Sequence, residues 1–174
     1  MKISNRSNII ELNSNDIQYI KWRNFDGHPD KLNPKGCLGN FTVVLTEEKA
    51  KEIEAIYEGK DMFAIKVRWK PNRDGDLEPT IKVSINWDGP SPDRRPRIAQ
   101  RTEGTGRMVE LNPETIGCLN SAELVGVQLL LNPSKGCGCY VVQGIFTITE
   151  RDLFAQYEDD VPFETGAGNE SEVY

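Results

Sequence analysis

The sequence predicts a mostly-β domain, a barrel or a sandwich with one inserted helix, followed by a short acidic tail. Three observations predict this class. Short segments rich in β-branched and aromatic residues recur along the chain, loops rich in Gly, Pro, Asn and Asp separate them, and one segment has helical periodicity. The 174 residues suit one domain. We place this domain at residues 1–155 and a flexible, disordered tail at residues 156–174.

The predicted strands follow from the alternation of apolar and polar side chains. Residues 61–71 and 80–87 place apolar side chains on one phase and Lys or Arg on the other. The Asp-Gly pair and the prolines between them indicate a hairpin with a long tip. The other predicted strands span residues 17–25, 40–45, 97–102, 107–111, 124–133 and 139–150.

The predicted helix spans residues 46–59. Thr46 is a good N-cap, two glutamates follow it, and Gly59 provides a stop. Apolar side chains repeat at helical spacing at Ala50, Ile53, Ile56 and Tyr57.

The net charge of −6 is unevenly distributed along the chain. Residues 150–174 hold eight acidic side chains and one basic side chain, a net −7, so residues 1–149, with 20 basic and 19 acidic side chains, carry +1. Residues 66–107 hold ten basic and six acidic side chains, a local +4. Local clustering is a better guide to nucleic-acid binding than net charge, so the acidic total does not exclude such binding.

Several function classes lack the motifs that they need. No apolar run approaches the ~18 residues of a membrane span, and no apolar signal-peptide region is present, so we expect a cytoplasmic protein without membrane association. There is no Gly-rich phosphate loop, and His28 is the only histidine. Asp74, Asp76 and Glu78 could bind Mg²⁺, but their turn-rich surroundings favour solvation. We therefore expect no enzymatic activity and no cofactor.

The four cysteines are Cys37, Cys118, Cys137 and Cys139. Structural zinc sites prefer paired cysteines that are more widely spaced than the last two, and the others are scattered. Free thiols are the favoured interpretation, because the cytosol keeps thiols reduced. A zinc site formed by these cysteines, with His28 as a further candidate ligand, is the alternative.

Residues 17–155 resemble a widespread family of phage and prophage single-stranded DNA-binding proteins. In the opening IKWRNFDGHPDKLNPKGCLGNFTVVL, Arg-Asn-Phe and a Gly lead through Asn-Pro-Lys-Gly to Asn-Phe and an apolar strand. A Glu/Lys-rich helix, VRWKP, EPTIKVSINW, RIAQ, SAELVGVQLLLNP and YVVQGIFTIT follow in the family's order. The matching positions of the opening are Arg23, Asn24, Phe25, Gly27, Asn33, Pro34, Lys35, Gly36, Asn40 and Phe41.

The resemblance implies an OB-fold, a five-stranded barrel with extra strands or hairpins and one short helix here. It also implies binding of single strands without strong sequence preference. The chain departs from the family after the late proline, where SKGCGC replaces a segment that often holds Trp or Tyr. The tip of this last hairpin is therefore expected to contact DNA differently or not at all.

Sequence-tolerant binding of single strands needs aromatic side chains that stack on bases and cations that follow the phosphates. All three tryptophans are near basic residues in sequence, and the Lys66, Arg68, Lys70 and Lys82 stripe shares the polar phase of two adjacent strands. The predicted DNA-binding residues are Trp22, Arg23, Phe25, Lys35, Lys66, Arg68, Trp69, Lys70, Lys82, Trp87, Arg94, Arg95, Arg97 and Arg101.

Many of these residues also have a structural interpretation. Trp69 and Trp87 continue apolar faces, which favours packing in the core, whereas the face of Trp22 is undecided. The basic stripe is alternatively a solvated face. The loop at residues 33–36 is alternatively a plain turn. The loop at residues 94–97 is alternatively a generic basic loop.

The segment EDDVPF at residues 158–163 resembles the acidic tip that ends bacterial single-strand binding proteins. That tip docks its Phe in an apolar pocket of replication and repair partners. The resemblance implies partner binding by Asp159, Asp160, Val161, Pro162 and Phe163. Eleven residues follow Phe163, so the terminal carboxylate of the bacterial tip is missing there. The alternative is an acidic tail that keeps the protein soluble and competes with DNA.

We therefore expect a non-catalytic protein that coats and protects single-stranded DNA during phage replication or recombination in a bacterial host cell. We expect a homo-oligomer, with a dimer favoured, and recruitment of replication or recombination proteins through the tail. The alternative is an acidic protein-interaction module, such as a DNA-mimic inhibitor of a host enzyme. Such a mimic would carry acids across its folded body.

Overall fold

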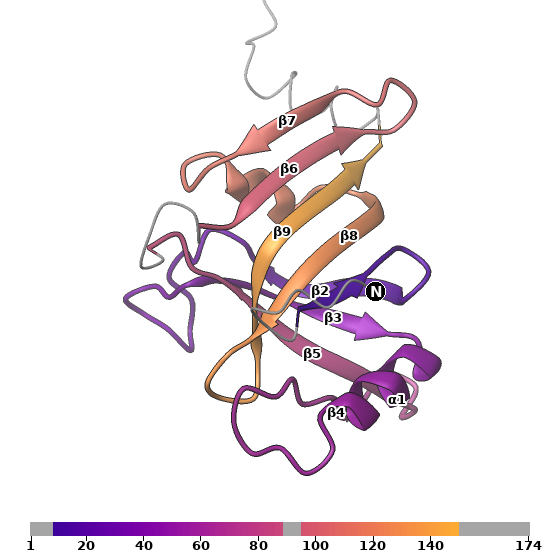
Figure 1. The fold of residues 1–174 in the computed structure, drawn as a ribbon. Helices are drawn as coiled ribbons and strands as arrows, with labels where there is room; N and C mark the ends of the chain where they lie inside the picture. The colour runs from indigo at the N-terminus through magenta and orange to yellow at the C-terminus, as the bar shows by residue number, and fades with distance from the viewer. Residues whose placement is uncertain (1–8, 89–94, 150–174) are drawn as a thin grey trace, which may run out of the picture.

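The computed structural model describes residues 9–88 and 95–149 (Figure 1). In this part of the chain, nine strands form one mixed sheet, accompanied by one α-helix and one 3-10 helix. The elements are β1 (Ile10–Leu12), β2 (Ile17–Asn24), β3 (Gly39–Leu45), α1 (Glu47–Ile56), β4 (Arg68–Pro71), β5 (Leu77–Ile85), β6 (Arg97–Thr102), β7 (Met108–Leu111), η2 (Ile116–Asn120), β8 (Leu124–Pro133) and β9 (Cys139–Ile148). The prediction of a mostly-β chain with one α-helix is confirmed. No helix of these ranges is long and apolar enough to cross a membrane.

The sheet has the strand order β1-β8-β9-β5-β3-β2. β4 pairs with β5, and β7 pairs with β6. Most pairs are antiparallel, but β9 runs parallel to both β5 and β6, which lie one after the other along its edge. The β6–β7 hairpin lies at one end of the molecule, and α1 and β4 lie at the other (Figure 1).

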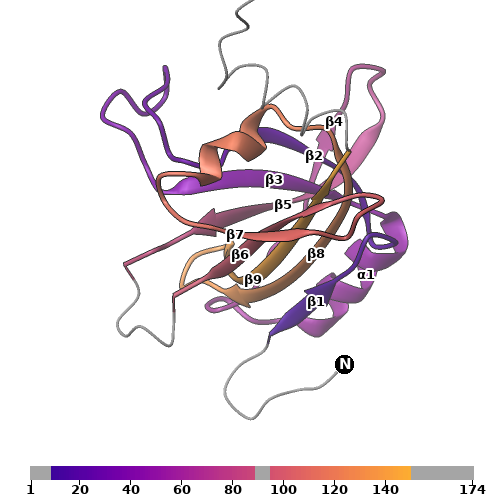
Figure 2. The same cartoon turned by 90° about the horizontal axis from the view of Figure 1, so that it is seen from above.

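The core lies between strands from the two ends of this order. β2 and β3 lie on one side and β8 and β1 on the other (Figure 2). Phe25 stacks on Phe41 with 4.7 Å between ring centroids, and Phe146 of β9 meets both rings edge-on. Large aromatic side chains contribute strongly to core stability, so this cluster joins the β2–β3 side to β9.

The helix forms where its capping signals predict it. The Thr46 hydroxyl accepts a hydrogen bond from the Lys49 amide at 3.2 Å, which satisfies one of the free amides of the first turn. Ala50, Ile53 and Tyr57 are buried, whereas Ile56 is exposed. Three of the four predicted apolar positions therefore pack against the sheet.

The strand predicted at residues 61–71 is shorter than its alternation suggests, because only Arg68–Pro71 pairs with β5. Ala64 and Ile65 are both buried although they are adjacent, and Phe63 is exposed with a φ of 52°. The Lys66 amide donates to the Cys137 carbonyl, in the loop between β8 and β9, at 3.0 Å. Residues 61–67 therefore do not extend the hairpin, and Lys66 forms a hydrogen bond with the loop between β8 and β9 instead.

Candidate nucleic-acid interface

Four adjacent strands, β2, β3, β5 and β4, present a polar face away from the core. Lys21, Thr42 and Lys82 lie in register in one row across β2, β3 and β5. Arg68 and Lys70 of β4 pair with Thr80 and Glu78 of β5, which point to the same side of the strand as Lys82. The four cations Lys21, Arg68, Lys70 and Lys82 therefore share this side of the sheet. We call this surface the Trp22 face. Its charged and aromatic members are Tyr19, Lys21, Trp22, Arg68, Lys70, Glu78 and Lys82.

Trp22 reaches this face because β2 is irregular. Strict alternation would group Trp22 with Ile20 and Asn24, which are both buried. The pairing of β2 with β3 shifts between Lys21 and Asn24, and Trp22 has a φ of 53°. The bulged backbone leaves the indole 60% exposed. The face of Trp22, undecided from the sequence, is thus the outer one.

Positive φ is unusual for a bulky side chain, and such strain costs about 1–3 kcal/mol. The strained residue carries a ring with two cations close to it. The Lys21 and Lys70 ammonium nitrogens lie 4.4 Å and 5.0 Å from the ring centroid. Both distances are within the range of a cation–π interaction. The arrangement joins an exposed aromatic plane to two positive charges.

Glu78 organises the Tyr19 side of the same face. Its carboxylate accepts hydrogen bonds from the Tyr19 hydroxyl and from the Lys21 ammonium, the latter at 3.0 Å. The hydrogen bond from Tyr19, followed by that from Lys21, lowers the pKa of Glu78, and the same bond to Glu78 raises the pKa of Tyr19. The carboxylate therefore stays ionised at neutral pH and holds both side chains in place.

The interpretation of Glu78 as part of a solvated acidic turn is wrong. Glu78 lies in β5 and is buried, whereas Asp74 and Asp76 are exposed in the turn before it. Sequence reasoning also missed Tyr19 and Lys21. Their alternation with buried Ile20 was the available signal.

Two of the tryptophans pack against the core. Trp69 lies on the opposite side of β4 from Arg68 and Lys70, and its indole donates to the Glu54 carboxylate of α1 at 3.3 Å. Trp69 and Trp87 are both partly buried against the hydrophobic core. This supports the packing interpretation of both rings.

Lys66 does not join the basic stripe. It precedes β4, and its ammonium donates to the Lys60 carbonyl at 2.7 Å. The phase shared by Arg68, Lys70 and Lys82 is confirmed by the strand register.

Phe25 cannot contact DNA in this structure. Its side chain is 0% exposed within the aromatic core, so no ring face is open to a base. Arg23 lies nearby and is half-buried. Its guanidinium donates to the carbonyls of Leu119, at 3.3 Å, and Ala122. These contacts give Arg23 a structural role in joining β2 to η2.

The long loop after β2 is anchored at its base. The side-chain amide of Asn24 donates to the backbone carbonyl of His28 and accepts from the backbone N–H of His28, both at 3.0 Å. Asp26 accepts from His28 at 2.7 Å and from the Asn120 side chain at 3.0 Å. Burial raises the pKa of Asp26, but these hydrogen bonds outweigh it and the net shift is downward. Lys35 is exposed beyond this anchored base.

The predicted arginines of the later segment belong to different strands from the Trp22 face. Arg97 and Arg101 lie on β6, where Arg97 pairs with Glu110 of β7 at 3.6 Å and Arg101 donates to the Met108 sulfur at 3.8 Å. Arg95 is exposed just before β6. Arg94 and the predicted tail motif, residues 159–163, lie outside the described residues.

The four cysteines are free thiols in environments that differ. Cys37 and Cys137 are exposed, Cys118 is half-buried and Cys139 is buried. Burial raises the pKa of both Cys118 and Cys139, so their neutral thiols are favoured. Across residues 9–88 and 95–149, no three His, Cys, Asp or Glu side chains come close enough together to hold a metal ion.

The chain matches, over residues 1–171, the family model described as "Putative phage ssDNA-binding domain". Searches of the curated proteins and of the solved structures returned no match. The match covers the Trp22 face, its loops and nearly all of the acidic tail. The chain belongs to this family of phage single-stranded DNA-binding domains.

Proposed function

We propose that the protein binds single-stranded DNA on the Trp22 face, with bases stacked on Trp22 and Tyr19 and phosphates held by the surrounding cations. The observation that carries the proposal is the exposed Trp22 ring with two lysine ammoniums within 5.0 Å of its centroid. Stacking on aromatic rings suits any base, and the cations contact the common backbone. Both features favour binding without sequence preference.

We further propose that the sheet is an OB-fold, which would place nucleic acid on these same strands. β2, β3, β5, β8 and β9 would supply the five strands of the barrel. β1 precedes β2 closely in the chain and pairs with β8 at the far end of the strand order, which would bring the two ends of the sheet together. OB-folds bind nucleic acids on strands 2 and 3 and on the loops 1–2 and 4–5. These correspond to β3, β5 and the loops at residues 25–38 and 134–138.

The biological role that we propose is coating and protection of single-stranded DNA in phage replication or recombination, without catalysis, in the cytoplasm of the host. Residues 1–155 would form the DNA-binding domain. The tail at residues 156–174 would recruit partners through Asp159–Phe163. A DNA mimic would need a folded body with acidic faces, and the cations of the Trp22 face argue against that alternative.

The test is a titration of fluorescently labelled oligo-dT and of a duplex of equal length, followed by anisotropy at about 50 and 200 mM salt. The proposal expects preference for oligo-dT and weaker binding at the higher salt. Trp22→Ala should weaken oligo-dT binding about 5- to 150-fold, the effect of one lost base stack. Phe63→Ala removes an exposed ring outside the four strands and should change little.

A further inference from the structure

A second outer face crosses β1, β8, β9 and β6, on strands that the Trp22 face does not use. The register aligns Glu11, Leu130, Gln143 and Arg97 in one row across these four strands. The residues on either side of Glu11, and those on either side of Arg97, are buried, so this row points outward. We call this surface the Gln143 face.

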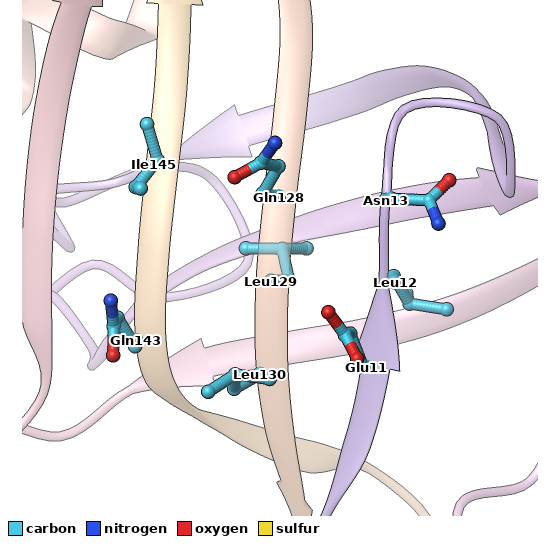
Figure 3. A pocket seen from close by; sticks show the side chains of 8 residues that line it. All are labelled: Glu11, Leu12, Asn13, Gln128, Leu129, Leu130, Gln143 and Ile145. Carbon is cyan, nitrogen blue, oxygen red and sulfur yellow. The ribbon is translucent and has the colours of Figure 1, made fainter. Parts of the chain in front are cut away.

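Two shallow hollows open on the Gln143 face and share Gln143 and Ile145. One, of about 220 Å³, lies between β1, β8 and β9 (Figure 3). The other, of about 310 Å³, lies between β9, β6 and β7. Side chains of a facing surface could fill both, because packed sheets interdigitate their side chains.

The centre of the Gln143 face carries no charge. Gln128, Leu130, Gln143 and Ile145 occupy it and are exposed or half-exposed. Depletion of charge at the centre of a surface, with charge at its rim, is typical of protein–protein interfaces. A surface built only for solvation would not need this pattern.

The charges at the rim are self-complementary. Glu11 ends the row on β1, and Arg97 ends it on β6. A two-fold axis running along the strands between β8 and β9 would exchange β8 with β9 and β1 with β6 of the facing copy. Glu11 of each copy would then lie opposite Arg97 of the other, beside the Arg97–Glu110 pair within each chain, which makes two equivalent charge networks in an isologous contact.

This pattern fits a second copy better than DNA or the acidic tail. Glu11 of β1 and Glu110 of the adjoining β7 balance Arg97 and Arg101 of β6, so these charges of the face cancel. A neutral face does not attract a polyanion. The four cations of the Trp22 face, of which Arg68 and Lys82 are exposed, offer such a ligand a better site.

We infer that the Gln143 face is the interface of a homodimer, with two copies packed sheet against sheet about the axis between β8 and β9. The Trp22 face of each copy stays open in this arrangement. The inference stands on the register and the charges of the Gln143 face and does not depend on DNA binding.

The test is sedimentation equilibrium of the full chain and of charge-swap variants. The wild type should dimerise. Glu11→Arg alone and Arg97→Glu alone each place like charges opposite one another in two places and should each weaken dimerisation about tenfold. The variant that combines both swaps restores opposite charges and should recover dimerisation to within about threefold of the wild type.

Two further variants complete the design. Gln143→Glu introduces an unpaired charge near the axis and should weaken the dimer, because burying such a charge is costly. Glu58→Arg reverses an exposed charge after α1 and should have no effect. A monomeric wild type, single swaps without effect, or a combined variant that stays as weak as the single swaps would each overturn the inference. Oligo-dT titration of Glu11→Arg in parallel reports DNA binding separately.

Discussion

At the residue scale, Trp22 combines an unfavourable backbone conformation with an exposed ring. A left-handed conformation costs an L-residue roughly 1–2 kcal/mol, and the cation–π contacts with Lys21 and Lys70 offset this cost. Residues held in such conformations cluster at functional sites. The strain at Trp22 is therefore the local cost of presenting a ring on the outer face.

Replacing Trp22 separates its contribution to stability from its contribution to binding. Trp22→Gly and Trp22→Ala both remove the ring, but only glycine adopts a φ of 53° without strain. We expect Trp22→Gly to be more stable than Trp22→Ala by about 1 kcal/mol in urea unfolding, with equally weakened oligo-dT binding. Trp22→Phe serves as the control that keeps an aromatic plane. Wild-type affinity in Trp22→Gly would contradict the role of the ring.

Glu78 makes stability depend on pH in a defined direction. Its pKa lies below the ordinary value of 4.5, because Tyr19 and Lys21 bind the carboxylate. Its contribution to stability is present above 4.5 and is lost as the pH falls through the lower pKa of the folded state. We therefore expect the wild type to lose more stability than Glu78→Gln on acidification, as measured by thermal unfolding. Equal losses would show that the carboxylate is not anchored.

At the scale of elements, the hairpin of β4 and β5 carries three of the four cations of the Trp22 face, Arg68, Lys70 and Lys82. Its turn is held by the Asn72 side chain, whose oxygen accepts from the amides of Asp74 and Asp76 at 2.9 Å and 3.0 Å. β4 has only four residues, so it depends strongly on this turn.

We expect Asn72→Ala to loosen β4. Two backbone amides lose their partner, which costs about 1 kcal/mol in an exposed turn. Hydrogen exchange of the β4 amides should accelerate, and oligo-dT affinity should fall modestly because Lys70 is less well placed beside Trp22. Arg73→Ala, a change of an exposed residue in the same turn, is the matched control. Unchanged exchange in Asn72→Ala would mean that β4 is held by other contacts.

The elements that the sequence predicts well are those with local signals. The helix has its N-cap and the β6–β7 and β8–β9 hairpins have their turns, and all three form as predicted. β1, the late start of β4 and the bulge at Trp22 were not predictable in this way. β1 pairs with β8 from the other end of the chain, and Lys66 bonds to the distant Cys137. These contacts depend on tertiary structure, which no short window of sequence reports.

At the scale of the whole molecule, the opposed charges of the body and the tail should govern DNA binding. Each phosphate contact made with a single strand contributes about −0.7 to the slope of log affinity against log salt. Lys82→Gln should therefore reduce the steepness by about 0.7, whereas Lys51→Gln on α1 should leave it unchanged. A slope unaffected by Lys82→Gln would remove that residue from the binding surface.

Removal of residues 158–174 tests the tail. This deletion takes away most of the negative charge of the tail, so competition with DNA for the cations should weaken. We expect oligo-dT affinity equal to or higher than that of the full chain in the same titration. A large loss of affinity would contradict competition between the tail and DNA.

The pairing of β1 with β8 also bears on how the protein is made. Ile10 pairs with Leu131, so more than a hundred further residues must be synthesised before β1 can pair with β8. Long-range pairings of this kind slow folding. β2, β3, β4 and β5 come from the first half of the chain, so the Trp22 face has its strands early. The ribosome thus releases the strands of the Trp22 face before the strands that complete the core beneath it.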